Sequence, residues 1–194
     1  MTARTGMASV ITTLRAWAEA GTAEYTLGSE TYYTDDHLED ILDRHSELVQ
    51  RYPMTVLTDY NDNAVAIYLN YVFPGDHWEE ATSGTAVWQV EDSTGKNIGT
   101  AQYTVNYNQG VITFSADTSG SALYLTGRRY DVKRAASEVW RRKAANVSSR
   151  VTWSSDNHRV ESGQLYQHYL GMAVSYEKEA TARFVRTRRV DVAK

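Results

Sequence analysis

Two histidines and three aspartates fall close together in one expected helix and are the first residues that could do chemistry. His37 and His45 lie eight residues apart, with Asp36, Asp40 and Asp43 around them. A metal site needs ligands that converge at fixed distances and angles. Here the aspartates also suit a solvated helix face, and His45 suits the apolar stripe of the helix. We therefore expect no metal and no cofactor at these residues.

Two further strings match catalytic or phosphate-binding motifs only in part. Gly-Asp-His-Trp at 75–78 places an aspartate and a histidine in an expected loop, but no serine or cysteine motif accompanies it. Ser-Thr-Gly-Lys at 93–96 shares only its last two residues with a phosphate-binding loop, and a polar hairpin turn explains it equally well. The chain has no cysteine, which excludes thiolate nucleophiles, disulfides and cysteine metal clusters. We expect a protein that is not an enzyme.

The charge of the chain is unevenly distributed along the sequence. The net charge is −4, but residues 1–127 hold 5 Lys and Arg against 17 Asp and Glu, and residues 128–194 hold 15 against 7. The two portions therefore carry −12 and +8. This separation favours a subunit whose two ends contact different partners, or contact each other head to tail. Solvated faces of opposite sign would give the same counts.

Basic clusters at 128–129, 141–143 and 183–189 could contact nucleic-acid phosphates. The whole chain is acidic, however, with a pI near 5.7, and it carries no known reader motif. Arginine binds the carboxylates of a protein partner equally well. We therefore expect protein partners rather than sequence-specific binding of DNA.

Length and composition fit one globular domain that carries an insertion. The chain has 194 residues, of which 42% are hydrophobic and 23% charged. No stretch approaches the roughly 20 apolar residues that cross a bilayer. The first ten residues lack the charged-then-apolar pattern of a signal peptide. We expect a protein that is made in the cytoplasm and makes no membrane contact.

Helical patterns lie at both ends of the chain. Thr34 is a good N-cap and is followed by two aspartates in the first helical turn, where the helix dipole favours negative charge. Gly21 is expected to end the first helix, and Pro53 to end the second near residue 50. Asp131 and Ser162 are expected to begin the last two. The predicted helices cover 8–20, 34–50, 131–147 and 162–182.

The middle of the chain has the pattern of antiparallel strands. Short β-branched or aromatic runs, several alternating with period two, are separated by turn signals rich in Asn, Asp and Gly. A three-residue hairpin loop is expected at 108–110. The runs cover 55–59, 65–73, 85–91, 102–107, 111–115 and 122–126.

The fold class is therefore α+β: a small bundle of about four helices, an antiparallel β-rich insertion and an extended basic C-terminal tail. Residues 1–52 and 128–182 are expected to form the helical core. Residues 53–127 form the β-rich insertion, and residues 183–194 the tail, which would become ordered on contact with a partner.

Several segments carry a pattern found in one protein family. Residues 124–132 read Tyr-Leu-Thr-Gly-Arg-Arg-Tyr-Asp-Val, and Ala-Ala-Ser-Glu-Val-Trp follows at 135–140. The acidic-capped helix at 33–45, the polar segment 151–156 and the Ser-Gly-Gln-Leu string at 162–165 fit the same pattern. Together they resemble the head–tail adaptor proteins of long-tailed double-stranded DNA phages, also called connector or head-completion proteins. The likeness covers about half of the chain.

The resemblance implies a structural virion protein at the head–tail interface. Its subunits would form a ring, expected to be a dodecamer, that docks under the portal and links the DNA-filled head to the neck and tail. The implied partners are the portal ring, further copies of the chain, and the next neck, head-closure or tail protein. Genomic DNA would pass through the channel without sequence-specific binding.

The resemblance and the charge pattern also indicate which residues would make these contacts. In relatives of this kind the C-terminal segment reaches the portal, and the matching positions are Arg183, Phe184, Val185, Arg186, Arg188 and Arg189. Opposed charges suit a contact between neighbouring subunits. For that contact we expect Arg134, Arg141, Arg142, Asp35, Asp36 and Asp40.

A second function class stays open, a sugar- or host-surface-binding accessory module of a phage virion. The chain has 14 Tyr and 5 Trp, and those in the β-rich segment could offer stacking faces to sugars. This alternative predicts that residues 53–127 fold alone and bind glycan. The adaptor hypothesis predicts that they do neither usefully.

Overall fold

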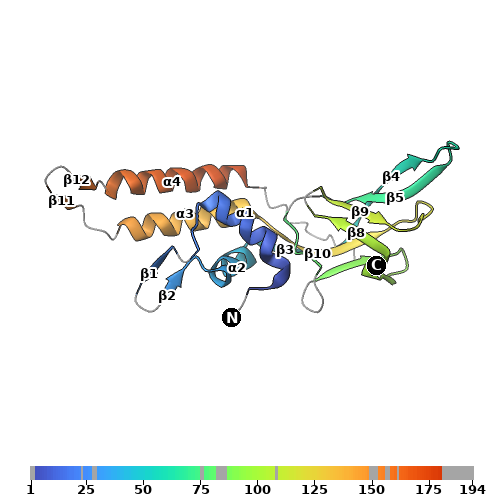
Figure 1. Cartoon of the computed structure of the whole chain (residues 1–194), viewed down its shortest axis with the longest axis horizontal. Helices are drawn as coiled ribbons and strands as arrows, with labels where there is room; N and C mark the ends of the chain where they lie inside the picture. Colours follow the sequence, from blue (N-terminus) through green and yellow to red (C-terminus); the bar gives the residue numbers. More distant parts are fainter. Residues whose placement is uncertain are drawn as a thin grey trace, which may run out of the picture.

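The computed structural model describes residues 3–22, 24–27, 30–74, 77–81, 87–107, 109–148, 153–155, 158–160 and 162–180. These residues form four α-helices, two four-stranded antiparallel sheets and two short hairpins. The fold class is α+β, as the sequence predicts. The molecule is elongated, with the helices at one end and the two larger sheets at the other (Figure 1).

The helical end is built around one central helix, α3. It spans Val132–Ser148 and packs against α1 (Ala8–Ala18), α2 (Asp35–Arg44) and α4 (Ser162–Glu179). A short 3₁₀ helix, Thr5–Met7, precedes α1. The buried side chains here include Met7, Val10, Ile11, Leu14, Leu38, Ile41, Leu42, Val132, Ala135, Ala136 and Val139.

Local capping signals place the helix starts as predicted. The Thr34 side chain accepts a hydrogen bond from the backbone N–H of His37 at 3.3 Å, which begins α2. The Asp131 carboxylate accepts one from the backbone N–H of Arg134 at 3.0 Å, which begins α3. The end of α1 differs from the prediction. Glu19 takes the left-handed conformation, with φ 47°, so the helix ends before Gly21 is reached.

The second helix is shorter than predicted. It ends at Arg44, and the strand β3 (Ser46–Pro53) occupies the segment expected to complete it. The backbone of β3 pairs with β10 from Ser46↔Tyr130 to Pro53↔Tyr124, so sheet pairing outweighs a weak helical pattern. Helical spacing after Leu38 and Ile41 would bury Leu48, but as part of β3 it is 48% exposed.

The first sheet has the order β3-β10-β6-β7. Its other strands are β10 (Tyr124–Tyr130), β6 (Trp88–Glu91) and β7 (Asn97–Ile98). β10 runs four residues further than predicted because its last residues pair with the start of β3. β3 and β10 therefore connect the helical end to the β-rich end.

The second sheet has the order β4-β5-β9-β8. Its strands are β4 (Thr55–Tyr60), β5 (Ala66–Val72), β9 (Val111–Phe114) and β8 (Tyr103–Asn106), the last preceded by a 3₁₀ turn at Thr100–Gln102. β8 and β9 pair as a hairpin, as predicted, but their last pair is Asn106↔Val111, so four residues separate the strands instead of the predicted three. A second core includes Tyr71, Phe73, Trp78, Trp88, Val90, Tyr103, Ile112, Phe114, Leu123 and Leu125.

Two short hairpins occupy segments for which the sequence predicted neither helix nor strand. β1 (Tyr25–Leu27) pairs with β2 (Glu30–Tyr32), and β11 (Trp153–Ser155) pairs with β12 (His158–Val160) between α3 and α4. The predicted tail, residues 183–194, lies outside the described residues.

Candidate functional site

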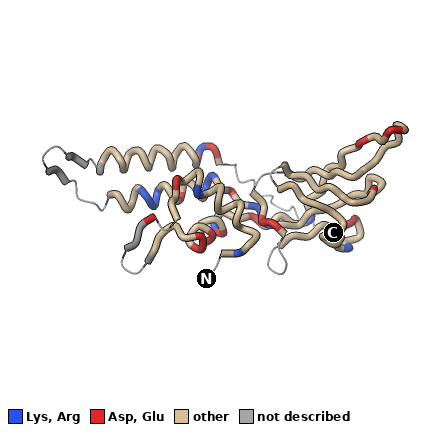
Figure 2. Tube along the Cα trace, viewed as in Figure 1, with Lys and Arg blue, Asp and Glu red and all other residues tan. Residues whose placement is uncertain are grey.

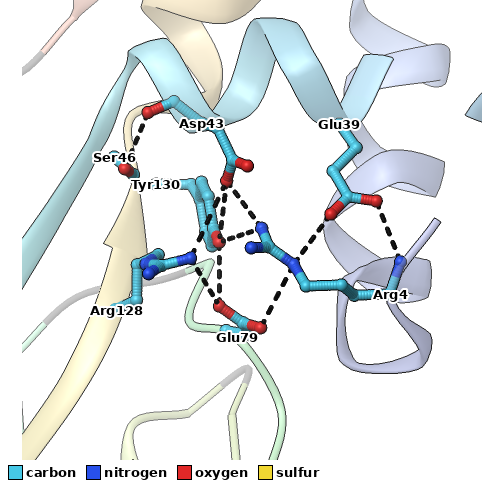
Figure 3. A network of polar contacts seen from close by, with 7 residues as sticks. All are labelled: Arg4, Glu39, Asp43, Ser46, Glu79, Arg128 and Tyr130. Atoms are coloured by element: carbon cyan, nitrogen blue, oxygen red, sulfur yellow. Dashed lines mark hydrogen bonds and ion pairs between the residues drawn. The ribbon is translucent and has the colours of Figure 1, made fainter. Parts of the chain in front are cut away.

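Seven polar residues meet where the helical end joins the β-rich end (Figure 3). At their centre is Glu79, whose side chain is 1% exposed. Its carboxylate accepts a hydrogen bond from the Tyr130 hydroxyl at 2.9 Å and forms ion pairs with Arg128 at 3.6 Å and Arg4 at 3.5 Å. We call the set the junction network: Arg4, Glu39, Asp43, Ser46, Glu79, Arg128 and Tyr130.

Arg4 connects the N-terminal segment to α2 within this network. Its guanidinium donates to Asp43 at 2.6 Å and lies 2.7 Å from a Glu39 oxygen, and its backbone N–H donates to Glu39 at 2.9 Å. Burial lowers the pKa of Arg4, but the hydrogen bond to Asp43 and the nearby negative charges outweigh it and raise the pKa. The guanidinium is therefore a permanent cation between two acidic residues of α2.

Tyr130 is held in its protonated form. Burial raises the pKa of its hydroxyl well above the ordinary value, and the negative charge of Glu79 raises it further. The hydroxyl therefore acts as a hydrogen-bond donor to Glu79 and not as a base. Each residue of the junction network forms a hydrogen bond or an ion pair with another residue of the network. These contacts join α2, the N-terminal segment, β10 and the loop at 77–81.

The two histidines considered as metal ligands face α3 instead of each other. His45 lies 2.8 Å from the Glu138 carboxylate, and His37 lies 3.0 Å from the Arg142 guanidinium. Arg142 also donates to Glu138 at 2.6 Å. Burial would raise the pKa of Glu138, but these hydrogen bonds and the neighbouring positive charges lower it. Within the described residues, no group of three or more His, Asp or Glu could hold a metal ion.

The three arginines expected at a subunit contact are paired within the chain. Arg134 forms an ion pair with Asp131 at 3.2 Å, Arg142 is bound as described, and Arg141 pairs with Glu177 of α4. Arg141 remains 54% exposed. The basic face of α3 is thus partly neutralised by its own chain, and much of it joins α3 to its neighbouring helices.

The three aspartates of the same prediction lie on α2, and two of them are exposed. Asp35 is exposed and pairs with Arg15 of α1 at 2.7 Å. Asp36 is half-buried, and Asp40 is exposed. The predicted portal contacts, Arg183, Phe184, Val185, Arg186, Arg188 and Arg189, lie outside the described residues.

The helix α4 is less buried than its sequence indicates. Helical spacing predicts a buried stripe, but among the described side chains of 163–180 only Ala173 is buried. The residues of this predicted stripe are Leu165, Tyr166, Tyr169, Leu170, Ala173 and Val174. Leu165 is 38% exposed and Val174 is 45% exposed, although both belonged to the predicted stripe. The other apolar side chains are half-buried: Tyr166, Tyr169, Leu170, Met172 and Tyr176.

One sequence feature could have revealed this surface. Residues 162–176 contain no Asp, Glu, Lys or Arg, so the helix has no charged face to direct toward water. In the structure α4 packs along α3 on one side (Figure 1). Leu165 and Val174 are nine residues apart, about half a turn around the helix axis, so they lie on opposite flanks of the side that packs on α3. The side opposite the buried Ala173 carries exposed polar or small residues: Gln164, Gln167, His168, Gly171 and Ser175.

A second exposed surface lies at the opposite end of the molecule. The β4–β5 hairpin projects from the sheet (Figure 1), and Leu57, Tyr60 and Val65 are 43%, 70% and 56% exposed. The Asn61 side chain accepts hydrogen bonds from two backbone N–H groups of the turn, at 3.0 and 2.9 Å, which fixes the tip. Figure 2 shows acidic residues on the hairpin. The sequence predicted the two strands but gave no sign that they project.

The geometry offers an exposed apolar hairpin at one end, a partly exposed helix without charged residues over 162–176 at the other, and a buried polar junction between them. No helix in the described part of the chain is both long and apolar enough to cross a membrane. No family model, curated protein or solved structure matches the chain.

Proposed function

We propose that the chain is a structural virion protein, a head–tail adaptor subunit that forms a ring under the portal and links the head to the neck and tail. The observation that carries the proposal is the surface of α4. This helix has 15 consecutive residues without Asp, Glu, Lys or Arg, and among its described side chains only Ala173 is buried. Apolar side chains on both of its flanks therefore stay partly in water, as they do at protein–protein contacts.

The connection between the two ends also suits a subunit that must transmit force from one end to the other. β3 and β10 run from the helical end into the β-rich end as one antiparallel pair. The junction network adds charged hydrogen bonds around the buried Glu79 at the same place. A subunit built in this way transmits force between its ends because neither end can turn freely about a flexible linker.

The sugar-binding alternative was based on the Tyr and Trp side chains of the β-rich insertion, and most of these are not accessible to a sugar. Most of the large aromatic side chains in the insertion fill the second core: Tyr71, Phe73, Trp78, Trp88, Tyr103 and Phe114 are all at most 7% exposed. Sugar stacking requires an accessible ring face. Of the exposed large hydrophobic residues in the described insertion, Tyr60 is the aromatic one.

The proposal is tested by mixing the purified chain with the portal ring of the same phage. Size exclusion with light scattering should show a gain in mass of about twelve subunits per portal ring, as a closed ring of adaptors requires. Removing residues 183–194 should abolish co-migration, because the arginine-rich segment is the proposed portal contact. Ser9→Asp, on the exposed surface of α1, is the matched control and should bind normally.

Two results would count against the proposal. Intact chain and intact portal that never co-migrate would remove the adaptor role. Full binding by the chain lacking residues 183–194 would remove the tail from the portal contact.

A further inference from the structure

The strand β4 lies at the edge of the second sheet. Within the described residues it pairs only with β5, from Thr55↔Val72 to Tyr60↔Ala66. The register shift in this pairing belongs to β5, because two steps along β4, from 57 to 59, match three steps along β5, from 70 to 67. β4 itself is therefore a regular strand of six residues without a bulge.

The hydrogen bonds at the two ends of β4 show which of its backbone groups point away from β5. The N–H of Asn61 donates to the C=O of Val65 at 3.0 Å, toward β5. The N–H of Met54 donates to the C=O of Leu123 at 2.9 Å, on the other side. Backbone groups alternate in direction along a strand, so the outward N–H groups of β4 are those of residues 56, 58 and 60. Within the described residues, no backbone group bonds to them.

The edge lacks the features that usually prevent further pairing. Proteins protect edge strands with a bulge, a proline, a lysine or a covering segment. β4 contains no proline and no lysine, and five of its six residues are exposed. The β4–β5 hairpin projects from the sheet (Figure 1), so the described chain leaves this edge uncovered. An edge of this kind can accept a further strand.

The acidic residues of the hairpin have no cation beside them. Residues 52–95 contain no Lys or Arg. The Asp59 carboxylate accepts a hydrogen bond from the Asn70 amide at 3.0 Å, and neither Asp59 nor Asp62 forms an ion pair within the described residues. On α2, by contrast, Asp35 pairs with Arg15 at 2.7 Å. A partner with a cation next to Asp59 would add a charge pair that the hairpin lacks.

The two faces of β4 differ in chemistry. Side chains alternate along a strand, so Leu57 and Asp59 lie on one face and Val56 and Tyr60 on the other. Val56 packs against the second core, and Tyr60 continues the same face beyond it, where its side chain is 70% exposed. A strand added to this edge would place basic side chains beside Asp59 and apolar side chains beside Tyr60.

We propose that β4 accepts a strand from a partner protein, an extended segment in which Lys or Arg alternates with apolar residues. Main-chain hydrogen bonds supply the affinity, and Asp59 and Tyr60 select the sequence. A second copy of β4 does not fit, because pairing two hairpins brings two copies of Asp59 and Asp62 together without a cation. The inference goes beyond the adaptor role and does not depend on it.

A synthetic peptide tests the proposal on the full chain. The probe is Thr-Lys-Val-Lys-Val-Lys-Thr with a fluorescent label, and its binding is measured by fluorescence anisotropy at low salt. The same peptide with N-methyl groups on its three central residues should bind at least tenfold more weakly, because it cannot form the hydrogen bonds of a sheet. The peptide with glutamate in place of each lysine should also bind at least tenfold more weakly, because like charges then meet at Asp59.

Two pairs of variants locate the contact on β4. Thr58→Pro removes an outward N–H and should weaken binding at least tenfold, whereas Thr58→Ala keeps the N–H and should bind normally. Asp59→Asn should weaken binding several-fold at low salt, and added salt should reduce the difference. Its matched control is Asp40→Asn, an exposed position on α2 that should have no effect.

Amide hydrogen exchange, followed by NMR, reports the site independently of affinity. The peptide should slow exchange at residues 56, 58 and 60 and leave Asn61 unchanged, because its N–H is already bonded. A lysine peptide that does not bind, that binds equally well when N-methylated, or that protects another edge such as β3 or β8 would overturn the inference. Slowed exchange at the same amides without peptide, increasing with protein concentration, would mean that β4 pairs with a second copy and would also overturn it. Portal co-migration tests the adaptor role separately, so either proposal can fail alone.

Discussion

Glu79→Ala tests whether the junction network stabilises the fold. The substitution removes the acceptor of the Tyr130 hydroxyl and one anionic partner each of Arg128 and Arg4. Removing one partner of a buried ion pair costs about 3–5 kcal/mol, because the remaining charge is left in a poorly solvated site. Arg4 keeps Glu39 and Asp43, so the expected loss lies at the low end, at about 3 kcal/mol.

Glu79→Gln separates the hydrogen bond from the charge. The amide oxygen still accepts from the Tyr130 hydroxyl and the shape is preserved, so the expected loss is about 1–2 kcal/mol. The matched control is Glu47→Ala, which removes an exposed ion pair with Arg129 at 3.0 Å. An exposed pair contributes about 0–1 kcal/mol.

The free energy of unfolding is measured by urea titration, followed by tryptophan fluorescence. Trp78 lies one residue before Glu79 and is 1% exposed, so its emission reports on this region. A loss below about 1 kcal/mol in Glu79→Ala, no larger than that of the Glu47→Ala control, would refute the reasoning that the buried network contributes to stability.

Two further predictions follow from close packing and from titration. Gly127→Ala should destabilise by about 1–3 kcal/mol, measured by urea titration, because a Cβ there would lie 3.0 and 3.1 Å from Trp78 ring carbons. The lowered pKa of Glu138 means that its contribution is present above the ordinary glutamate value of 4.5 and is lost as the pH falls. Glu138→Gln should therefore lower the Tm at neutral pH and flatten its decline in acid; a parallel decline in both proteins would contradict this.

The parts of the fold that sequence reasoning predicted are those with local causes. Thr34 and Asp131 cap helices through hydrogen bonds to backbone N–H groups three residues away. The hairpin of β8 and β9 is indicated by the turn signal at 108–110, and beside it the Asn106 side chain accepts a hydrogen bond from the backbone N–H of Gln109 at 3.1 Å. Such contacts involve neighbours in the sequence, so the pattern of residue types is sufficient to indicate them.

The parts that it missed depend on contacts between distant residues. The segment after Arg44 becomes a strand because β10, about eighty residues later, supplies its hydrogen-bond partners. Glu79 and Arg4 show no motif, and only the folded chain brings them together. On α4, helical periodicity identified the apolar side chains but did not show how little of them α3 covers.

The net charge is distributed differently in the folded chain than along the sequence. This distribution limits which parts of the chain could attract a charged partner. Residues 1–53 and 124–180 together hold 14 Lys and Arg against 15 Asp and Glu, so the helical end and its connecting strands are close to neutral. Arg15 with Asp35, and Arg44 with Glu138, show how this balance arises. The surplus of negative charge lies in residues 54–123, and the surplus of positive charge in residues 181–194, which hold 5 Lys and Arg against 1 Asp.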